Sequence, residues 1–254
     1  MTTIFKKPVT TALSLLILAS AGLTSVNATA SACVTGGSSE ATLQEVFNDN
    51  TVGGASSVNA NSGCLSHSDA TTWGVNSGGD AVITMVREIA GHAGSNTLGI
   101  YDATDSGTTV ELFSGSDSAN AQTTLSIDAT GSVFINGTDS GVSFAGNAFG
   151  FYLGTDMFGN FFSDSALNGG MADHMLAYQG EGDEILLPAG TWGADQYALA
   201  WEDLPYTNTD NDFNDMVVML SGVSPVSQVP LPAAVWLFGS GLLGLVGMAR
   251  RRTH

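Results

Sequence analysis

Short hydrophobic runs separated by polar turns fill the middle of the chain. Leu125 and Ile127 alternate with polar neighbours, and Val133 and Ile135 repeat this pattern after a turn at residues 128–131. A period of two predicts β-strands with one buried face. Similar runs predict ten strands: Ala81–Ile89, Thr97–Tyr101, Thr108–Phe113, Thr123–Ile127, Ser132–Ile135, Val142–Phe144, Phe149–Leu153, His174–Tyr178, Tyr197–Trp201 and Met216–Leu220.

The spacing of these runs predicts the fold class. Turn-forming residues lie between them, the chain contains 32 glycines, and Asn136-Gly137 is typical of a tight hairpin turn. Many short strands joined in this way predict an all-β fold, an antiparallel β-sandwich or jelly roll. We expect this sandwich over residues 80–222.

One segment before the strands has helical periodicity. Ser39–Asn48 places Leu43, Val46 and Phe47 on one face. It lies between Cys33 and Cys64, which we expect to form a disulfide that stabilises an exported chain by roughly 3 to 4 kcal/mol. Residues 33–79 are therefore predicted to be a small disulfide-stapled N-terminal extension with a short helix.

Residues 1–32 have the pattern of a secretory signal peptide. A pair of lysines precedes the apolar stretch Leu13–Leu23, and small residues follow. Cleavage after Ala30 or after Ala32 is compatible with this pattern. The second site would expose Cys33, as in a lipoprotein, but a lipobox normally has Leu at the position of Ala30. We therefore favour the disulfide over a lipid anchor.

The C-terminal end has three parts. After the expected linker at residues 223–229, the parts are a proline motif, an apolar segment at residues 233–249 and a basic cluster; the motif and cluster are Val229, Pro230, Leu231, Pro232 and Ala233, and Arg250, Arg251 and Arg252. At 1.5 Å per residue the apolar segment would extend about 25 Å as a helix, the short end of a membrane span. The positive-inside rule would keep the arginines cytoplasmic.

This end resembles the PEP-CTERM sorting signals of Gram-negative bacteria, in their VPLPA variant. The resemblance implies a signal at residues 230–254 that exosortase, a membrane-embedded cysteine protease, cuts near the prolines. It also implies transient anchoring in the inner membrane, export to the cell surface or extracellular matrix, and association with exopolysaccharide or biofilm. A permanent C-terminal anchor is the alternative, because hydropathy does not reveal cleavage.

Charge narrows the set of partners. The chain has 24 acidic and 6 basic residues and a net charge of −18. Between the two terminal segments the only basic side chain besides histidine is Arg87. Such a chain repels phosphate, so we expect no nucleic-acid partner. Without a lysine, the mature chain also lacks a phosphate-loop lysine or a Schiff base.

An acidic segment near the end of the strand region is the candidate metal site. Alternate side chains of an extended segment share a face, so Asp210, Asp212 and Asn214 are expected to converge while Phe213 enters the core. Calcium takes six to eight oxygen ligands, so the full predicted set is Glu202, Asp203, Asp210, Asp212, Asn214 and Asp215. An EF-hand is excluded because its sixth-position Gly is Asp215 here. A solvated acidic turn is the alternative.

The steps Trp201-Glu202-Asp203-Leu204 and Asp210–Asp215 resemble the signature of the bacterial domain-of-unknown-function 4114 family. The resemblance covers residues 145–222. It implies an extracellular β-rich module with a calcium-stabilised turn, and it does not imply an enzyme.

The sequence lacks the usual hydrolase motifs. There is no GxSxG or HExxH, and His174 is expected to be structural. The cluster Glu181, Asp183 and Glu184 leaves a glycoside-active carboxylate pair open. We therefore expect a structural or adhesive matrix protein and no enzyme. Calcium-dependent carbohydrate binding through Trp192 and Trp73 is the alternative.

Overall fold

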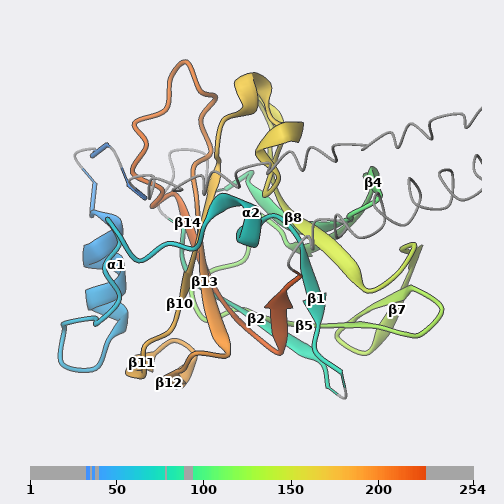
Figure 1. Ribbon diagram of the computed structural model, residues 1–254, viewed down its shortest axis with the longest axis horizontal. Coiled ribbons are helices and arrows are strands. Elements are labelled where there is room, and N and C mark those ends of the chain that lie inside the picture. The colour runs from blue at the N-terminus through green and yellow to red at the C-terminus, as the bar shows by residue number, and fades with distance from the viewer. Residues whose placement is uncertain (1–32, 35, 38–39, 78, 89–93, 227–254) are drawn as a thin grey trace, which may run out of the picture.

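The structure is a computed structural model that describes residues 33–34, 36–37, 40–77, 79–88 and 94–226. It is mostly β and antiparallel, as predicted, with two large sheets packed face to face and a smaller outer layer (Figure 1). The expected signal peptide and sorting signal lie outside the described residues. Within the described part of the chain, no helix combines the length and apolar character needed to cross a membrane.

The first large sheet has six strands in the order β15-β1-β8-β3-β4, with β9 also paired to β8. Its strands are β1 (Trp73–Val75), β3 (Thr97–Asp102), β4 (Asp105–Phe113), β8 (Ala148–Thr155), β9 (Gly159–Phe162) and β15 (Val223–Pro225). The expected linker at 223–229 therefore begins as a strand, because Val223 pairs with Val75.

The second large sheet has seven strands in the order β10-β13-β14-β2-β5-β6-β7. Its strands are β2 (Ala81–Glu88), β5 (Gln122–Ile127), β6 (Ser132–Ile135), β7 (Thr138–Ser143), β10 (Met175–Gln179), β13 (Gln196–Trp201) and β14 (Met216–Ser221). The predicted tight turn at Asn136-Gly137 joins β6 to β7, with positive φ angles of 52° and 73°.

The main core lies between the two sheets. Trp73, Ile100 and Phe151 of the six-stranded sheet meet Leu199 and Val218 of the seven-stranded sheet. Trp73 packs edge-to-face against Phe151 with ring centroids 6.0 Å apart. Strands β13 and β14 are buried on both faces, because alternate residues such as Ala198 and Met219 face a second core. Burial on both faces explains why the sequences of β13 and β14 are continuous apolar runs.

The second core lies under an outer layer of α1 (Leu43–Asn50) and the hairpin of β11 (Asp183–Leu186) with β12 (Ala189–Trp192). Helix α1 begins four residues later than predicted. Its N-cap is Thr42, which exchanges hydrogen bonds with Glu45 in a capping box. The predicted apolar face is confirmed, because Leu43, Val46 and Phe47 are buried.

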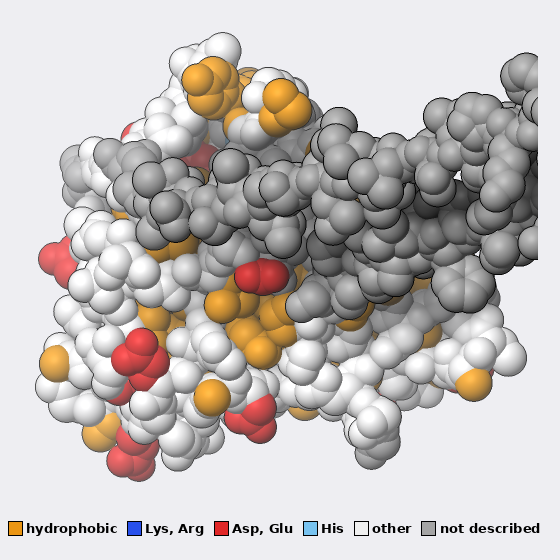
Figure 2. Space-filling view, in the orientation of Figure 1, with side chains coloured by type: hydrophobic (Ala, Val, Ile, Leu, Met, Phe, Trp, Pro, Cys, Tyr) orange, Lys and Arg blue, Asp and Glu red, His pale blue; other side chains and the backbone are white. Residues whose placement is uncertain are grey.

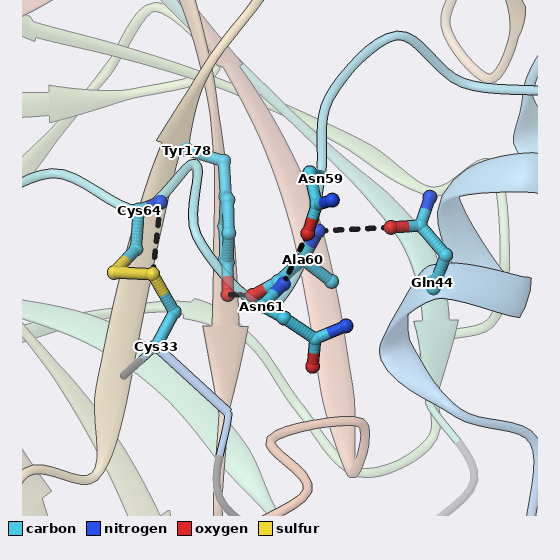
Figure 3. The surroundings of a disulfide bond; sticks show 7 residues. All are labelled: Cys33, Gln44, Asn59, Ala60, Asn61, Cys64 and Tyr178. Atoms are coloured by element: carbon cyan, nitrogen blue, oxygen red, sulfur yellow. Dashed lines mark hydrogen bonds between the residues drawn. A yellow bond between two sulfur atoms is a disulfide. The ribbon is translucent and has the colours of Figure 1, made fainter. Parts of the chain in front are cut away.

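The predicted disulfide is present and lies at the edge of this outer layer (Figure 3). Cys64 pairs with Tyr178 of β10 in an isolated bridge. The Tyr178 hydroxyl donates a hydrogen bond of 2.7 Å to the Ala60 carbonyl, and Ala60 N–H donates one of 2.9 Å to Gln44 of α1. The disulfide therefore ties the chain before α1 to the seven-stranded sheet.

The expected division at residue 79 is wrong. Strand β1 belongs to that N-terminal region and lies between β15 and β8 in the six-stranded sheet, and α1 covers the seven-stranded sheet. Residues 33–79 are therefore built into the sandwich. The sequence pattern does not predict this, because β1 is three residues long and too short to show alternation.

Candidate metal centre

The acidic segment connects β13 to β14 at one end of the sandwich. The two strands are antiparallel neighbours and end in register, with Trp201 opposite Met216. Glu202 and Asp203 therefore leave one strand where Asn214 and Asp215 enter the next. The intervening loop forms the tall orange excursion at the top of Figure 1.

The loop brings three predicted ligands together. Glu202, Asp210 and Asp212 each offer a carboxylate oxygen, and these oxygens lie within 4.8 Å of one another. Glu202 is 1% exposed and Asp212 is 3% exposed, whereas Asp210 lies at the surface. Three carboxylates at this spacing match the oxygen-rich ligand set of a hard cation.

Two side chains at this site carry buried polar atoms without a partner. Neither carboxylate oxygen of Glu202 has a hydrogen-bond partner of good geometry, and Asn214 Oδ1 also has none. Buried polar groups are nearly always satisfied, and an unpaired carboxylate is costly to bury. These oxygens mark a position where a ligand would complete the structure.

The electrostatics of the site agree with this geometry. Burial raises the pKa of Glu202 to about 7, and the charge of Asp210 adds to the rise. Burial and the neighbouring Asp212 likewise raise the pKa of Asp210. The only lysine or arginine of the described chain, Arg87, lies 3.7 Å from Asp49 in an ion pair. Among the described residues, no lysine or arginine side chain therefore balances the negative charge of the acidic turn.

The backbone brings these ligands together by a route that was not expected. The segment is irregular, and Asn211 and Phe213 have positive φ angles of 57° and 53°. The expected extended alternation is therefore wrong. Phe213 is buried as predicted, in the core under α1. Two left-handed residues reverse the chain between the acidic positions and turn Asp210 and Asp212 toward Glu202.

Asn214 supports the site and also binds the N-terminal segment. Its Nδ2 donates to Asp212 Oδ2 at 2.9 Å and to the Ala41 carbonyl at 2.7 Å. Gly36 N–H donates to the Asn211 carbonyl at 3.1 Å, and a Cβ at Gly36 would overlap the Asp210 carbonyl. The acidic turn thus packs directly against the chain that precedes α1.

Asp203 and Asp215, which were also predicted as ligands, are not in the group of three carboxylates and form hydrogen bonds with other partners. Asp215 accepts a hydrogen bond of 2.8 Å from Asp203 N–H, and Asp203 accepts one of 2.9 Å from Asn96 Nδ2. Burial, with the charge of Asp203, raises the pKa of Asp215 to about 8. Burial also raises the pKa of Glu88 to about 7. Glu88 and Asn96 were not among the predicted site residues. The only indication of Glu88 in the sequence was a single carboxylate at the end of an apolar strand.

The expected sugar-binding tryptophans are not surface platforms. Trp73 is 0% and Trp192 is 1% exposed. Trp73 fills the main core, and Trp192 packs edge-to-face against Phe47 of α1 with ring centroids 5.4 Å apart. The outer layer of α1 and the β11–β12 hairpin covers Trp192.

His174 and Asp183, two residues considered for catalysis, have contacts that are structural. His174 is buried, stacks on Phe161 at 3.8 Å, and has its pKa lowered by burial. Asp183 accepts hydrogen bonds from Ser56 and Ser57, which join the hairpin to the segment after α1.

The fold and this turn define an all-β sandwich domain with an acidic, oxygen-lined loop at one end. The model of the family described as Domain of unknown function (DUF4114) matches residues 37–222, and the chain belongs to this family. The match is longer than the expected 145–222 and central in the chain, since the whole sandwich forms the domain. No curated protein and no solved structure matches the chain.

Proposed function

We propose that the acidic turn binds Ca²⁺ and that the domain is a calcium-stabilised structural or adhesive module of the cell surface or extracellular matrix. The observation that carries the cation site is the buried Glu202 carboxylate, which lies beside Asp210 and Asp212 and whose two oxygens lack hydrogen-bond partners of good geometry. A divalent cation would supply the missing charge and the missing ligand contacts together. Asn214 Oδ1 is the natural fourth oxygen.

The cation would act on the fold through the N-terminal segment. Asn214 and Asn211 bind Ala41 and Gly36, and the disulfide at Cys33 fixes the start of the same segment. A turn held by a cation would keep this segment on the seven-stranded sheet. Calcium at extracellular concentrations suits such a role, because sites in extracellular modules bind in the 10⁻⁴ to 10⁻³ M range.

Export and sorting complete the proposal. The signal-peptide pattern of residues 1–32 and the PEP-CTERM-like end at residues 230–254 support export, transient membrane anchoring and cleavage by exosortase. The mature chain would then reside at the surface or in the matrix. The measurement is the intact mass of the exported protein: an end near Pro232 supports sorting, and retention of the three terminal arginines contradicts it.

Burial of Trp73 and Trp192 favours a structural role over carbohydrate binding. Sugar rings stack on exposed aromatic faces, and both of these rings are enclosed. In this proposal exopolysaccharide surrounds the protein as a component of the matrix, and the two tryptophans do not bind it.

Terbium luminescence tests the cation site directly. Tb³⁺ replaces Ca²⁺ at oxygen sites, and Trp201 adjoins Glu202 as a sensitiser. We expect Tb³⁺ emission in the parent that excess Ca²⁺ displaces, and at least a tenfold weaker affinity in Glu202→Gln. Glu184→Gln, an exposed carboxylate on β11, is the matched control. Equal emission from all three proteins would contradict the site.

A further inference from the structure

Three side chains from separate segments form a hydrogen-bonded chain on the surface. His67 begins the short helix α2 (His67–Ala70), Ser165 begins the 3₁₀ turn η1 (Ser165–Leu167), and Asp173 precedes β10. Ser165 Oγ lies 2.7 Å from His67 Nε2, and His67 Nδ1 lies 2.8 Å from Asp173 Oδ1. The first two residues are 98 positions apart.

The order of atoms is that of a nucleophile, a base and an orienting carboxylate. Asp173 accepts a hydrogen bond from Nδ1–H, which leaves Nε2 of a neutral His67 to accept the Ser165 hydroxyl proton. The bond to Asp173 also raises the pKa of His67, as expected for a base held by a carboxylate. Such triads are recognised by geometry and not by sequence order.

We propose that Ser165, His67 and Asp173 form an acyl-transfer site that cleaves carboxylic esters with a small apolar acyl group. Ser165 Oγ would attack the ester carbon while its proton passes to His67 Nε2. The carbon–alkoxy bond then breaks, and the same proton goes to the leaving alkoxide. Water, deprotonated by His67, resolves the acyl-serine to carboxylic acid and free Ser165.

The backbone at Ser165 offers a donor for the oxyanion. Its N–H makes only a long contact of 3.4 Å with His67 Nε2, whereas the next N–H, of Ala166, is engaged by Asp164 at 2.9 Å. The nucleophile's own N–H is a standard oxyanion donor in serine hydrolases. It would switch from His67 to the oxyanion as the tetrahedral intermediate forms.

The surroundings suit an acyl group that projects from a larger molecule. Ser165 and His67 are half-buried. Leu167 and Met171, on the same loop, are 43% and 75% exposed, and Figure 2 shows exposed hydrophobic side chains at this end of the molecule. An open apolar rim binds a short acyl chain and leaves room for a polymeric alcohol. None of its three members is a proposed cation ligand, although Asp173 precedes His174, whose Nδ1 lies 3.1 Å from the Glu202 carbonyl oxygen.

A fluorophosphonate probe tests the nucleophile in the purified full chain. We expect labelling that peptide mapping assigns to Ser165, together with hydrolysis of p-nitrophenyl acetate. Ser165→Ala should abolish both. His67→Gln, which can keep hydrogen bonds to its neighbours but is no base, should slow both by at least about 100-fold. Ser68→Ala removes a nearby exposed serine and should change neither.

Thermal unfolding of each variant confirms that it is folded before the rates are compared. An unlabelled parent would overturn the proposal. So would labelling that survives in Ser165→Ala, or a folded His67→Gln that reacts at the parental rate, because the three residues would then only join α2 to the loop before β10.

Discussion

Replacing Glu202 with Gln separates the two effects of its buried carboxylate. Without a cation the charge destabilises the fold, since the side chain is 1% exposed and neither oxygen has a hydrogen-bond partner of good geometry. With a cation the same charge is a ligand. The variant should therefore be no less stable than the parent in a chelator, yet gain almost nothing from Ca²⁺.

The magnitudes follow from the site. Raising the pKa of Glu202 from 4.5 to about 7 corresponds to roughly 3 kcal/mol of lost stability at about pH 8. The new amide leaves its own buried donors unpaired at a cost of about 1 to 3 kcal/mol. The variant should thus be about 0 to 2 kcal/mol more stable than the parent in EGTA. Calcium at about 100 times its Kd should stabilise the parent by about 2.7 kcal/mol.

The pH dependence has a definite sign. The folded-state pKa of Glu202 lies above its ordinary value, so the folded protein binds the extra proton between pH 4.5 and about 7. The stability that this protonation preserves is fully present below 4.5 and is lost as the pH rises through about 7. Any advantage of the variant in EGTA should therefore shrink as the pH falls from about 8 to about 4.5.

Thermal unfolding with EGTA and with millimolar Ca²⁺ measures these effects. For a domain of this size each kcal/mol shifts Tm by about 2 to 4 °C, so the parent should gain about 5 to 11 °C from Ca²⁺. Glu184→Gln should respond like the parent. A parent that ignores calcium, or a Glu202→Gln variant that gains as much as the parent, would refute the cation site and leave a solvated acidic turn.

Three further outcomes test the fold. Cys33→Ser with Cys64→Ser opens a loop with a sequence separation of 31 and should cost roughly 4 kcal/mol, seen as a lower Tm that reducing agent no longer changes. Trp192→Ala should cost about 3 to 5 kcal/mol in urea unfolding, because the ring is core; unchanged stability would contradict its burial. Burial acts to raise the pKa of Asp183, but hydrogen bonds from Ser57 and Ser56 outweigh it and lower the pKa. The Asp183 carboxylate therefore contributes stability that is present above pH 3.8 and is lost as the pH falls through the lowered pKa. Asp183→Asn should accordingly lose about 1 to 3 kcal/mol in urea unfolding at neutral pH and little in acid; equal losses at both pH values would contradict this role.

Local patterns predicted local structure well. Alternation at residues 123–127 and 132–135 gave the hairpin of β5 and β6, and Asn136-Gly137 gave the next turn, because both depend on neighbouring residues. The helix was found from its apolar face, but its start at Thr42 depends on the side-chain bonds of a capping box. Short strands such as β1 and β9 were missed, since three or four residues hold too little periodicity.

The sequence by itself determined the all-β class, the single disulfide and which oxygen-bearing residues could serve a cation, because composition and short-range periodicity specify these. Only the tertiary structure decided which carboxylates meet. Two left-handed residues turn Asp210 and Asp212 toward Glu202, while Asp203 and Asp215 bond elsewhere. It also buried Trp192 beneath α1 and placed His67 beside Ser165. Such contacts join residues far apart in the chain, and the packing of layers, which no local pattern encodes, sets their distances.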